Sequence, residues 1–553
     1  MRKSKTNTPE ASNELSAGRT AFVKKNWADA LRLLNLADQG PGLRAEDLEK
    51  LASSAYLVGR DSLHQSTLER AYLKYVDEGH AIDAARCAFW LGLTLLFVGK
   101  QGSATGWLTR AQRLIDEVNG ECVEEGYLTI PTAERQLAAT EWEAAYSTAT
   151  IAVKIGDHHK DTDLVACARH QQGRALIGQG RVEDGLALLD DAMIAVTSGE
   201  LSPIMTGLIY CSVIDVCQHV YALARSREWT TAMAKWCEDH PQMISFSSTC
   251  LAHRAEVMQF HGEWLDAIRE AELACVRNQN ESELPPPASA YYQQAEIHRL
   301  HGDFDAANIA YREASDRGFD PQPGLALLRL AEGHPDKAAA IIHRVMASTL
   351  DPLQRARLLP AHVEIMLATG DIGQAHKASQ ELLKVAEDFD TEVLVAMAAH
   401  TEGAVQLAQG DIKHALTTLR KAFTAWQQLA APYQTAQARV HLGMACRALG
   451  DEEGAAMELL GAQVIFEQLD AKIDLARISS LVTKTPSKSS HGLTPRELQI
   501  LRLVATGKTN KSIAAELCVS EKTVDRHISN LFNKLSVSSR AAATAYAYKN
   551  KLV

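Results

Sequence analysis

Hydrophobic and polar positions follow a helical period from about residue 16 to residue 482. Short turns interrupt this pattern, and they often carry a polar or glycine residue before an aromatic or apolar one, as in Asn26-Trp27 and Gly410-Asp411-Ile412. Alanine and leucine are abundant and aromatic residues make up only 6% of the chain, a composition that favours helix. The pattern therefore predicts an all-α protein made of consecutive amphipathic helices.

These helices also repeat. A small residue is followed twelve, sixteen and nineteen residues later by a small, a large and again a small residue. Small residues let two antiparallel helices approach closely, and the large residue fills the groove between neighbouring pairs. Since no pair buries its apolar face alone, the pairs must stack into a superhelix. The clearest copies begin at Gly18, Gly92, Gly173, Ala295, Gly403 and Gly443.

This repeat resembles the tetratricopeptide family over about 460 residues. The spacing departs from the family's period of about 34 residues, because Gly403 and Gly443 are 40 residues apart. A longer period is similar to the sensor superhelix of MalT-like regulators. We expect about eleven helix pairs over residues 16–482, with poor phasing at 40–90, 200–250 and 325–365. Residues 1–15 are polar, and we expect them to be a disordered N-terminus.

Charge separates the end of the chain from the rest. Residues 493–553 hold ten Lys and Arg against four Asp and Glu, a net +6, while the whole chain carries -11 and the remainder therefore -17. A small basic domain on a large acidic body indicates nucleic-acid contact by that domain alone. Between the two parts, residues 483–492 are polar and contain Ser and Pro, which predicts a linker.

The basic segment has the pattern of a helix, a second helix, a tight turn and a third helix with a polar and basic start. Such an arrangement places a short helix in the DNA major groove. The segment resembles the LuxR-type helix-turn-helix domain along residues 493–553, beginning with the motif Leu-Thr-Pro-Arg-Glu at 493–497. Thr494 and Glu497 have the spacing of a capping box. The expected fold class is thus an all-α tetratricopeptide-like α-solenoid followed by a small four-helix LuxR-type domain.

Each polar residue of this domain has an expected role. Ser520 should cap the third, recognition helix, with Thr523 at the capping-box spacing. Base reading should come from its outward positions, where Arg526 could bind a guanine edge and Asp525 replaces a basic residue common in the family. The candidates for phosphate contact are Asn510, Lys511, Lys522, Thr523, Lys534 and Arg540, and those for base reading are Asp525, Arg526, Ser529 and Asn530. Val524 has two alternatives, contact with a thymine methyl group or inward packing.

Helical spacing also predicts the core of the domain and a fourth helix. In the family the fourth helix, here Ala541–Tyr548, pairs two domains on a two-fold DNA site, so the resemblance implies a homodimer. The alternative is a simple packing helix. The expected core residues are Ile500, Leu503, Ile513, Leu517, Ile528, Leu531, Phe532 and Leu535.

Other chemistry finds little support in the sequence. Gly507-Lys508-Thr509 lacks the glycine of a phosphate loop at Arg502, so we expect no ATPase module of the MalT-like kind. His158-His159 and the pair Cys250 and His253 form no complete metal-ligand set. We expect no catalytic residue, metal or cofactor. Ten scattered cysteines, no signal peptide and no membrane span predict reduced thiols in a cytoplasmic protein.

Together these features predict a bacterial one-component transcription regulator that binds double-stranded DNA. A small-molecule or protein effector, whose binding residues the sequence does not reveal, would act on the repeat superhelix, and RNA polymerase is a candidate partner. The alternative is a tetratricopeptide scaffold or adaptor that its C-terminal domain recruits to DNA. Aromatic side chains of the repeats could line a concave effector site, although core wedges are the more usual role: Trp107, Trp142, Trp229, Trp236, Tyr210, Tyr291 and Tyr292.

Overall fold

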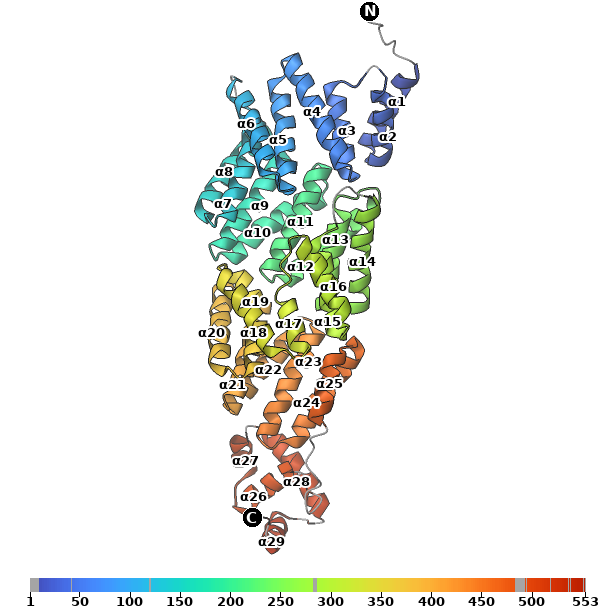
Figure 1. Cartoon of the computed structure of the whole chain (residues 1–553). Helices are drawn as coiled ribbons and strands as arrows, with labels where there is room; N and C mark the ends of the chain where they lie inside the picture. Colours follow the sequence, from blue (N-terminus) through green and yellow to red (C-terminus); the bar gives the residue numbers. More distant parts are fainter. Residues whose placement is uncertain are drawn as a thin grey trace, which may run out of the picture. The chain divides into compact units, whose positions relative to one another are not determined.

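The computed structural model describes residues 9–482 and 493–552, apart from 41, 119–120, 282–285, 494, 518, 536, 538 and 551. Throughout these residues the chain is helical or in turns, as predicted, and it contains no strand. Successive helices form antiparallel hairpins (Figure 1). The repeat helices are α1 Pro9–Val23, α2 Trp27–Asp38, α3 Ala45–Leu57, α4 Asp61–Glu78, α5 Ala81–Phe97, α6 Gln101–Asp116, α7 Val123–Ala138, α8 Trp142–His159, α9 Thr162–Gly178, α10 Val182–Thr197, α11 Pro203–His219, α12 Leu223–Asp239, α13 Ser247–Phe260, α14 Trp264–Glu281, α15 Ala288–His301, α16 Phe304–Asp316, α17 Gly324–Ala331, α18 Pro335–Ser348, α19 Pro352–Thr369, α20 Ile372–Phe389, α21 Glu392–Ala408, α22 Ile412–Gln428, α23 Pro432–Ala448, α24 Glu452–Leu469 and α25 Lys472–Val482.

The predicted close approach of paired helices is confirmed. A Cβ atom added to Gly403 of α21 would lie 2.6 Å from Cγ of Leu419 in α22, and one added to Gly443 of α23 would lie 2.9 Å from Cγ of Leu459. The large residue thus packs directly on the glycine of its own pair. Leu419 also shares a core cluster with Leu442 of the next pair, so it fills the groove between pairs as well. An all-helical tetratricopeptide-like solenoid is therefore the fold of this region.

Glycine and aspartate mark the turn inside three successive hairpins, at intervals of 40 residues. Gly370, Gly410 and Gly450 have φ values of 81°, 83° and 76°, which is the left-handed conformation that ends a helix. The aspartate that follows each glycine caps the next helix. Asp451, for example, accepts a hydrogen bond from the backbone N–H of Gly454 at 3.0 Å.

The repeat region differs from the expectation at its start. Residues 9–15 belong to α1, and Leu15 packs against the first core cluster, so burial of an apolar side chain extends the helix into the segment expected to be disordered. The described repeat region contains helices α1–α25, where about eleven helix pairs were expected. The poorly phased regions use other contacts, as where Gly207 of α11 packs under the ring of Phe246. Residues 1–8 and the expected linker at 483–492 lie outside the described residues.

The contacts divide the repeats and the C-terminal domain into two compact units. The first consists of Met1–Val257, Leu265–Gln294 and Glu313–Phe319, and the second of Met258–Trp264, Ala295–Arg312 and Asp320–Val553. Each unit contains contacts between residues that are far apart in sequence. In the first, the backbone N–H of Ile244 donates to the carbonyl of Leu57 at 2.9 Å. In the second, Nδ1 of His261 lies 3.1 Å from the carbonyl oxygen of Ala430.

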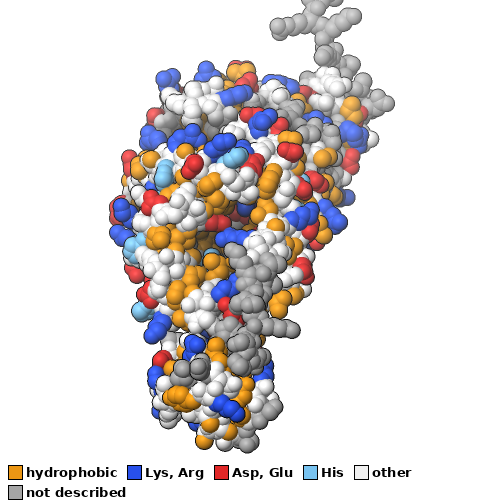
Figure 2. All heavy atoms as spheres, turned by 60° about the horizontal axis from the view of Figure 1, so that its bottom comes forward, with side chains coloured by type: hydrophobic (Ala, Val, Ile, Leu, Met, Phe, Trp, Pro, Cys, Tyr) orange, Lys and Arg blue, Asp and Glu red, His pale blue; other side chains and the backbone are white. Residues whose placement is uncertain are grey.

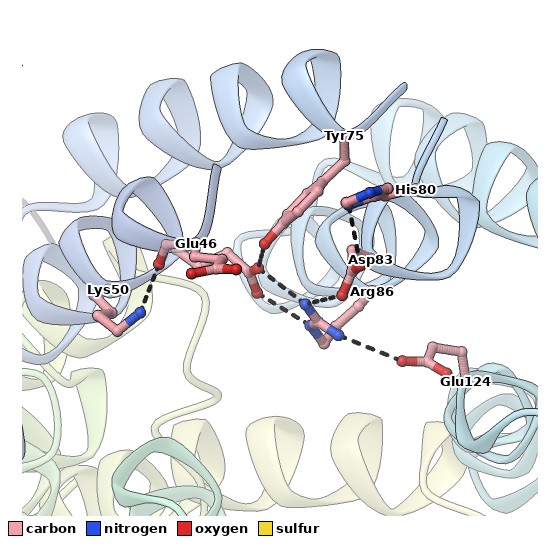
Figure 3. Close-up of polar contacts among 8 residues, drawn as sticks. Glu46, Lys50, Tyr75, His80, Asp83, Arg86 and Glu124 are labelled. Carbon is pink, nitrogen blue, oxygen red and sulfur yellow. Dashed lines mark hydrogen bonds and ion pairs between the residues drawn. The ribbon is translucent and has the colours of Figure 1, made fainter. Parts of the chain in front are cut away.

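A charged network joins four helices of the first unit (Figure 3). Arg86 of α5 donates from Nε and Nη2 to the carboxylate of Glu49 in α3, at 3.0 and 2.9 Å. Its Nη2 also reaches Asp83 at 2.7 Å, and Nη1 lies 3.7 Å from Glu124 of α7. Tyr75 of α4 donates to Glu49 at 2.5 Å. Glu124 is buried at this end of the network, and its burial raises the pKa of the carboxyl group.

Two further sequence expectations concern the described residues. The nine described cysteines are free thiols, six of them buried. Among the described helices, none combines the length and apolar content that a bilayer crossing requires.

Candidate nucleic-acid interface

The C-terminal domain consists of four helices around two adjoining clusters. These are α26 Pro495–Ala505, α27 Asn510–Glu516, α28 Glu521–Leu535 and α29 Arg540–Lys549. One cluster joins α26, α27 and α28, and the other joins α26, α28 and α29. Six of the eight predicted core residues are buried, and Leu503 and Phe532 pack half-buried against the clusters. The predicted helix-turn-helix, α27 and α28 with the turn between them, is confirmed.

Short polar side chains cap the helices of this domain. The backbone N–H of Thr523 donates to Oγ of Ser520 at 3.1 Å, and the two hydroxyl oxygens are 2.7 Å apart. Ser520 therefore caps α28 as predicted. The N-terminus of α28, like that of any α-helix, carries a partial positive charge. Thr509 caps α27 and Ser539 caps α29 in the same way. The expected cap Thr494 lies outside the described residues.

One face of α28 carries exposed polar side chains. Lys522, Asp525, Arg526 and Ser529 are exposed at helical spacings of three and four, and Asn530 lies half-buried beside them. Oγ of Ser529 donates to the backbone carbonyl of Asp525 at 2.9 Å. Lys511 is exposed on α27. The residues expected to contact DNA bases thus lie on the outer side of the helix.

The structure decides between the two alternatives for Val524. Its side chain has an exposed fraction of 0% and packs in the cluster with Ile500 and Ile513. Val524 is therefore a core residue, and its inclusion among the DNA-contacting residues was wrong. It lies on the side of α28 opposite to the exposed Lys522 and Arg526, where the core of the domain needs an apolar side chain.

Two candidates for phosphate contact also have partners within the domain. The side-chain amide of Asn510 donates to Asp525, and Nη1 of Arg540 donates to Oδ1 of Asn510 at 2.7 Å. Arg540 also donates to the backbone carbonyl of Lys508. These hydrogen bonds connect the starts of α27 and α29 with the exposed face of α28, so they fix the orientation of Asp525.

Sequence reasoning missed the structural role of the opening motif. Arg496 is buried and donates from Nη2 to the carbonyl of Leu517 at 3.2 Å, at the turn between α27 and α28. Glu497 is buried as well and accepts from Nζ of Lys534 at 2.8 Å. The available signal was their position, four residues before Ile500 and Leu501, which places both side chains on the inward face of α26.

A polar contact between α28 and α24 lies where this domain meets the repeat helices within the second unit. Nδ1 of His527 in α28 lies 3.4 Å from a carboxylate oxygen of Glu453 at the start of α24. His527 is buried on the flank of α28, whereas Lys522, Asp525 and Arg526 remain exposed. This contact therefore leaves the outer face of the helix open.

Metal-ligand groups, cavities and aromatic side chains are the features of the described repeat region that bear on an effector site. Among the residues that the structure describes, no three His, Cys, Asp or Glu side chains group in a way that could hold a metal ion. A cavity of about 300 Å³ lies between α8, α9 and α10, but its rim residues Arg169 and Asp191 pair with each other. Trp142 packs on Gly178, and the side chains of Tyr210, Tyr291 and Tyr292 are buried. These four aromatic residues therefore pack between helices in the core.

Comparison with known proteins agrees with this domain structure. Residues 491–547 match the family described as bacterial regulatory proteins, luxR family. A transcriptional regulatory protein, LiaR of Bacillus subtilis, is 56% identical over 61 residues, which are 11% of this chain and 29% of that protein. A putative HTH-type transcriptional regulator of Mycobacterium bovis is 30% identical over 251 residues, 43% of this chain and 27% of that protein.

The chain thus spans less than a third of the length of these relatives. Among solved structures, the chain is similar to one in the APC/C hetero-tetramer Cut9-Hcn1, with a TM-score of 0.42 and 12% identity, covering 98% of this chain and 96% of that chain. From the match of residues 491–547 and the geometry of α26–α29, the C-terminal domain is a helix-turn-helix domain of the luxR family of bacterial regulatory proteins, and it follows a tetratricopeptide-like α-solenoid.

Proposed function

We propose that this protein is a sequence-specific DNA-binding transcription regulator of the one-component type. The observation that carries the proposal is the capped helix α28, whose exposed face presents Lys522, Asp525, Arg526 and Ser529 from a luxR-family domain. A helix with free N-terminal backbone groups and a polar outer face fits the major groove, where base edges offer donors and acceptors.

Within this proposal the residues divide by role. Lys511, Lys522 and Thr523 contact phosphates and provide affinity, which is independent of sequence. Arg526, Ser529 and Asn530 read base edges together with Asp525, whose orientation Asn510 and Arg540 fix. Since Lys534 is paired with Glu497, its contribution to phosphate binding is smaller than that of an unpaired lysine.

We further propose that the repeat region controls the domain. An effector, a small molecule or a protein, shifts the superhelix between two arrangements, one of which frees the domains to pair through α29 as a homodimer. The contact between His527 and Glu453 supports control through the acidic start of α24, because carboxylates beside α28 repel phosphates. This regulator works in the cytoplasm, and RNA polymerase is its candidate partner at the promoter.

The proposal is tested by selecting DNA sequences bound by the full chain and measuring Kd for the selected site and for random DNA. Arg526→Ala should weaken binding to the selected site far more than binding to random DNA. If Arg526→Ala and Lys522→Ala both leave binding to the selected site unchanged, α28 is not the reading helix. Comparing these affinities in the presence and absence of fractionated host extract tests effector control separately.

A further inference from the structure

The outer face of α24 carries an apolar stripe, by which we mean Met457, Leu460 and Val464. Their exposed fractions are 63%, 53% and 52%. The spacings of three and four residues place them on one face of the helix. Ala456 and Gly461 flank the stripe, and the guanidinium group of Arg439 from α23 lies against Gly461.

The neighbouring repeats show that the fold does not require this stripe. In α22, forty residues earlier, the equivalent positions are exposed Thr417, Arg420 and Thr424. In α20, another forty residues earlier, they are exposed Lys377, Gln380 and Lys384. Three helices at the same place in the repeat thus carry outer faces of different chemistry. Contiguous exposed apolar side chains on a folded protein indicate a surface that a partner covers.

Acidic residues lie at both ends of the stripe. Glu453 precedes Met457 by four residues and Glu467 follows Val464 by three, so both carboxylates belong to the same face of α24. They are separated by fourteen residues along the helix, or about 21 Å at 1.5 Å per residue. A partner of matching chemistry is an α-helix with an apolar face between basic ends.

A second copy of the chain fits this surface less well. Two α24 helices packed face to face in opposite directions would bring Glu453 of one helix beside the acidic C-terminal end of the other. Packed in the same direction, they would place like carboxylates directly opposite each other. Both arrangements oppose like charges at each end of a small apolar contact.

We propose that the stripe on α24 is a docking site for an amphipathic helix of another protein, with apolar anchors at positions i, i+3 and i+7 and Lys or Arg at both ends. This docking does not depend on the DNA binding proposed above. Because Glu453 also contacts His527, the docked helix lies next to the DNA-binding domain and can influence it.

The test uses the full chain and a synthetic 18-residue helical peptide of alanine with leucines at i, i+3 and i+7 and lysines at both ends. A matched peptide carries glutamates instead of the lysines. The stripe variant Met457→Thr/Leu460→Arg/Val464→Thr has the residues of α22, which this fold already accommodates. Leu350→Thr is the control, because Leu350 is exposed at 87% and lies outside the stripe.

We expect the lysine peptide to bind the wild type and Leu350→Thr equally, and the stripe variant at least about tenfold more weakly, since anchor residues dominate such interfaces. Glu453→Gln/Glu467→Gln should weaken lysine-peptide binding, and the glutamate peptide should bind poorly. Equal binding by the stripe variant overturns the proposal, as does a wild-type dimer in sedimentation that the stripe variant loses. Affinity for DNA is measured in parallel, so a failure of docking is distinguishable from a failure of DNA binding.

Discussion

The ammonium group of Lys534 lies 2.8 Å from the carboxylate of Glu497, whose side chain has an exposed fraction of only 1%. The pair connects the last turn of α28 to the first turn of α26. Lys534, on the flank of α28, therefore has a partner inside the domain. Replacing Lys534 affects the stability of the domain as well as its net charge.

We predict that Lys534→Met destabilises the C-terminal domain, because it leaves the buried Glu497 carboxylate without its cation. Breaking a fully buried pair costs about 3–5 kcal/mol, but Lys534 reaches solvent, so we expect about 1–3 kcal/mol. Urea unfolding followed by circular dichroism measures the change. The double variant Glu497→Gln/Lys534→Met should recover part of the loss, and no recovery would contradict the pairing.

Substitutions on the outer face of α28 should separate the recognition of DNA bases from the electrostatic attraction to DNA phosphates. Arg526→Ala should cost about 1–3 kcal/mol at the selected site and broaden the sequence preference at one base pair. Lys522→Ala should weaken binding to every sequence alike and reduce the dependence on salt. Fluorescence anisotropy at several salt concentrations distinguishes the two. Val524→Thr should instead lower stability, since Val524 is buried.

The effect of a Gly→Ala substitution on stability should depend on the space around each glycine of the repeat. Gly403→Ala would place a Cβ atom 2.6 Å from Cγ of Leu419, so we expect a loss of about 1–3 kcal/mol. Gly106→Ala in α6 is the matched control, because nothing lies within 4 Å of its added Cβ. It should stabilise the chain by about 0.5–1 kcal/mol. Thermal unfolding of both variants checks this, and equal effects would refute the close approach of α21 and α22.

A buried imidazole pair should make the second unit sensitive to acid. The indole N–H of Trp426 donates to Nδ1 of His400 at 3.3 Å, and Nε2 of His400 lies 3.0 Å from Nδ1 of His441. Because the indole only donates, His400 must accept at Nδ1 and carry its proton on Nε2, so both rings are neutral. Burial lowers the pKa of His400 to about 4 and that of His441 to about 3.

The direction of the pH effect follows from these lowered pKa values. Above about pH 6.5 both rings are neutral in the folded and the unfolded chain. Below it the unfolded chain binds protons that the folded chain does not, so the free energy of unfolding falls by up to about 1.4 kcal/mol per pH unit and ring. We expect His400→Gln/His441→Gln to show a smaller loss between pH 7 and pH 5 than the wild type in urea unfolding. Identical slopes would contradict neutral, buried rings.

The contact between α24 and α28 gives a prediction about how the repeat region controls DNA affinity. If the carboxylate of Glu453 repels DNA phosphates beside α28, Glu453→Gln should raise the affinity for both selected and random DNA. The effect should shrink at high salt, as expected for charges that ions screen. Glu467→Gln, on the same face of α24 but fourteen residues away, is the control and should leave DNA affinity unchanged.

The amino-acid sequence determined the elements of this protein and the spacing of its repeats. Helical periodicity, the glycine and leucine sixteen residues apart, the glycine–aspartate boundaries and the cap at Ser520 all act over fewer than twenty residues, so they are readable along the chain. For the same reason the helix-turn-helix and most of its core were predictable, together with the outer positions of α28.

Only the tertiary structure decided which partners distant side chains find. It turned Val524 inward, joined Asn510 to Asp525 and Arg540, and buried Glu497 against Lys534. It also brought Ile244 to Leu57, and it left the stripe of α24 uncovered. Such contacts depend on the angles at which separate helices meet. These angles follow from packing over the whole fold, whereas periodicity records only which face of each helix is apolar.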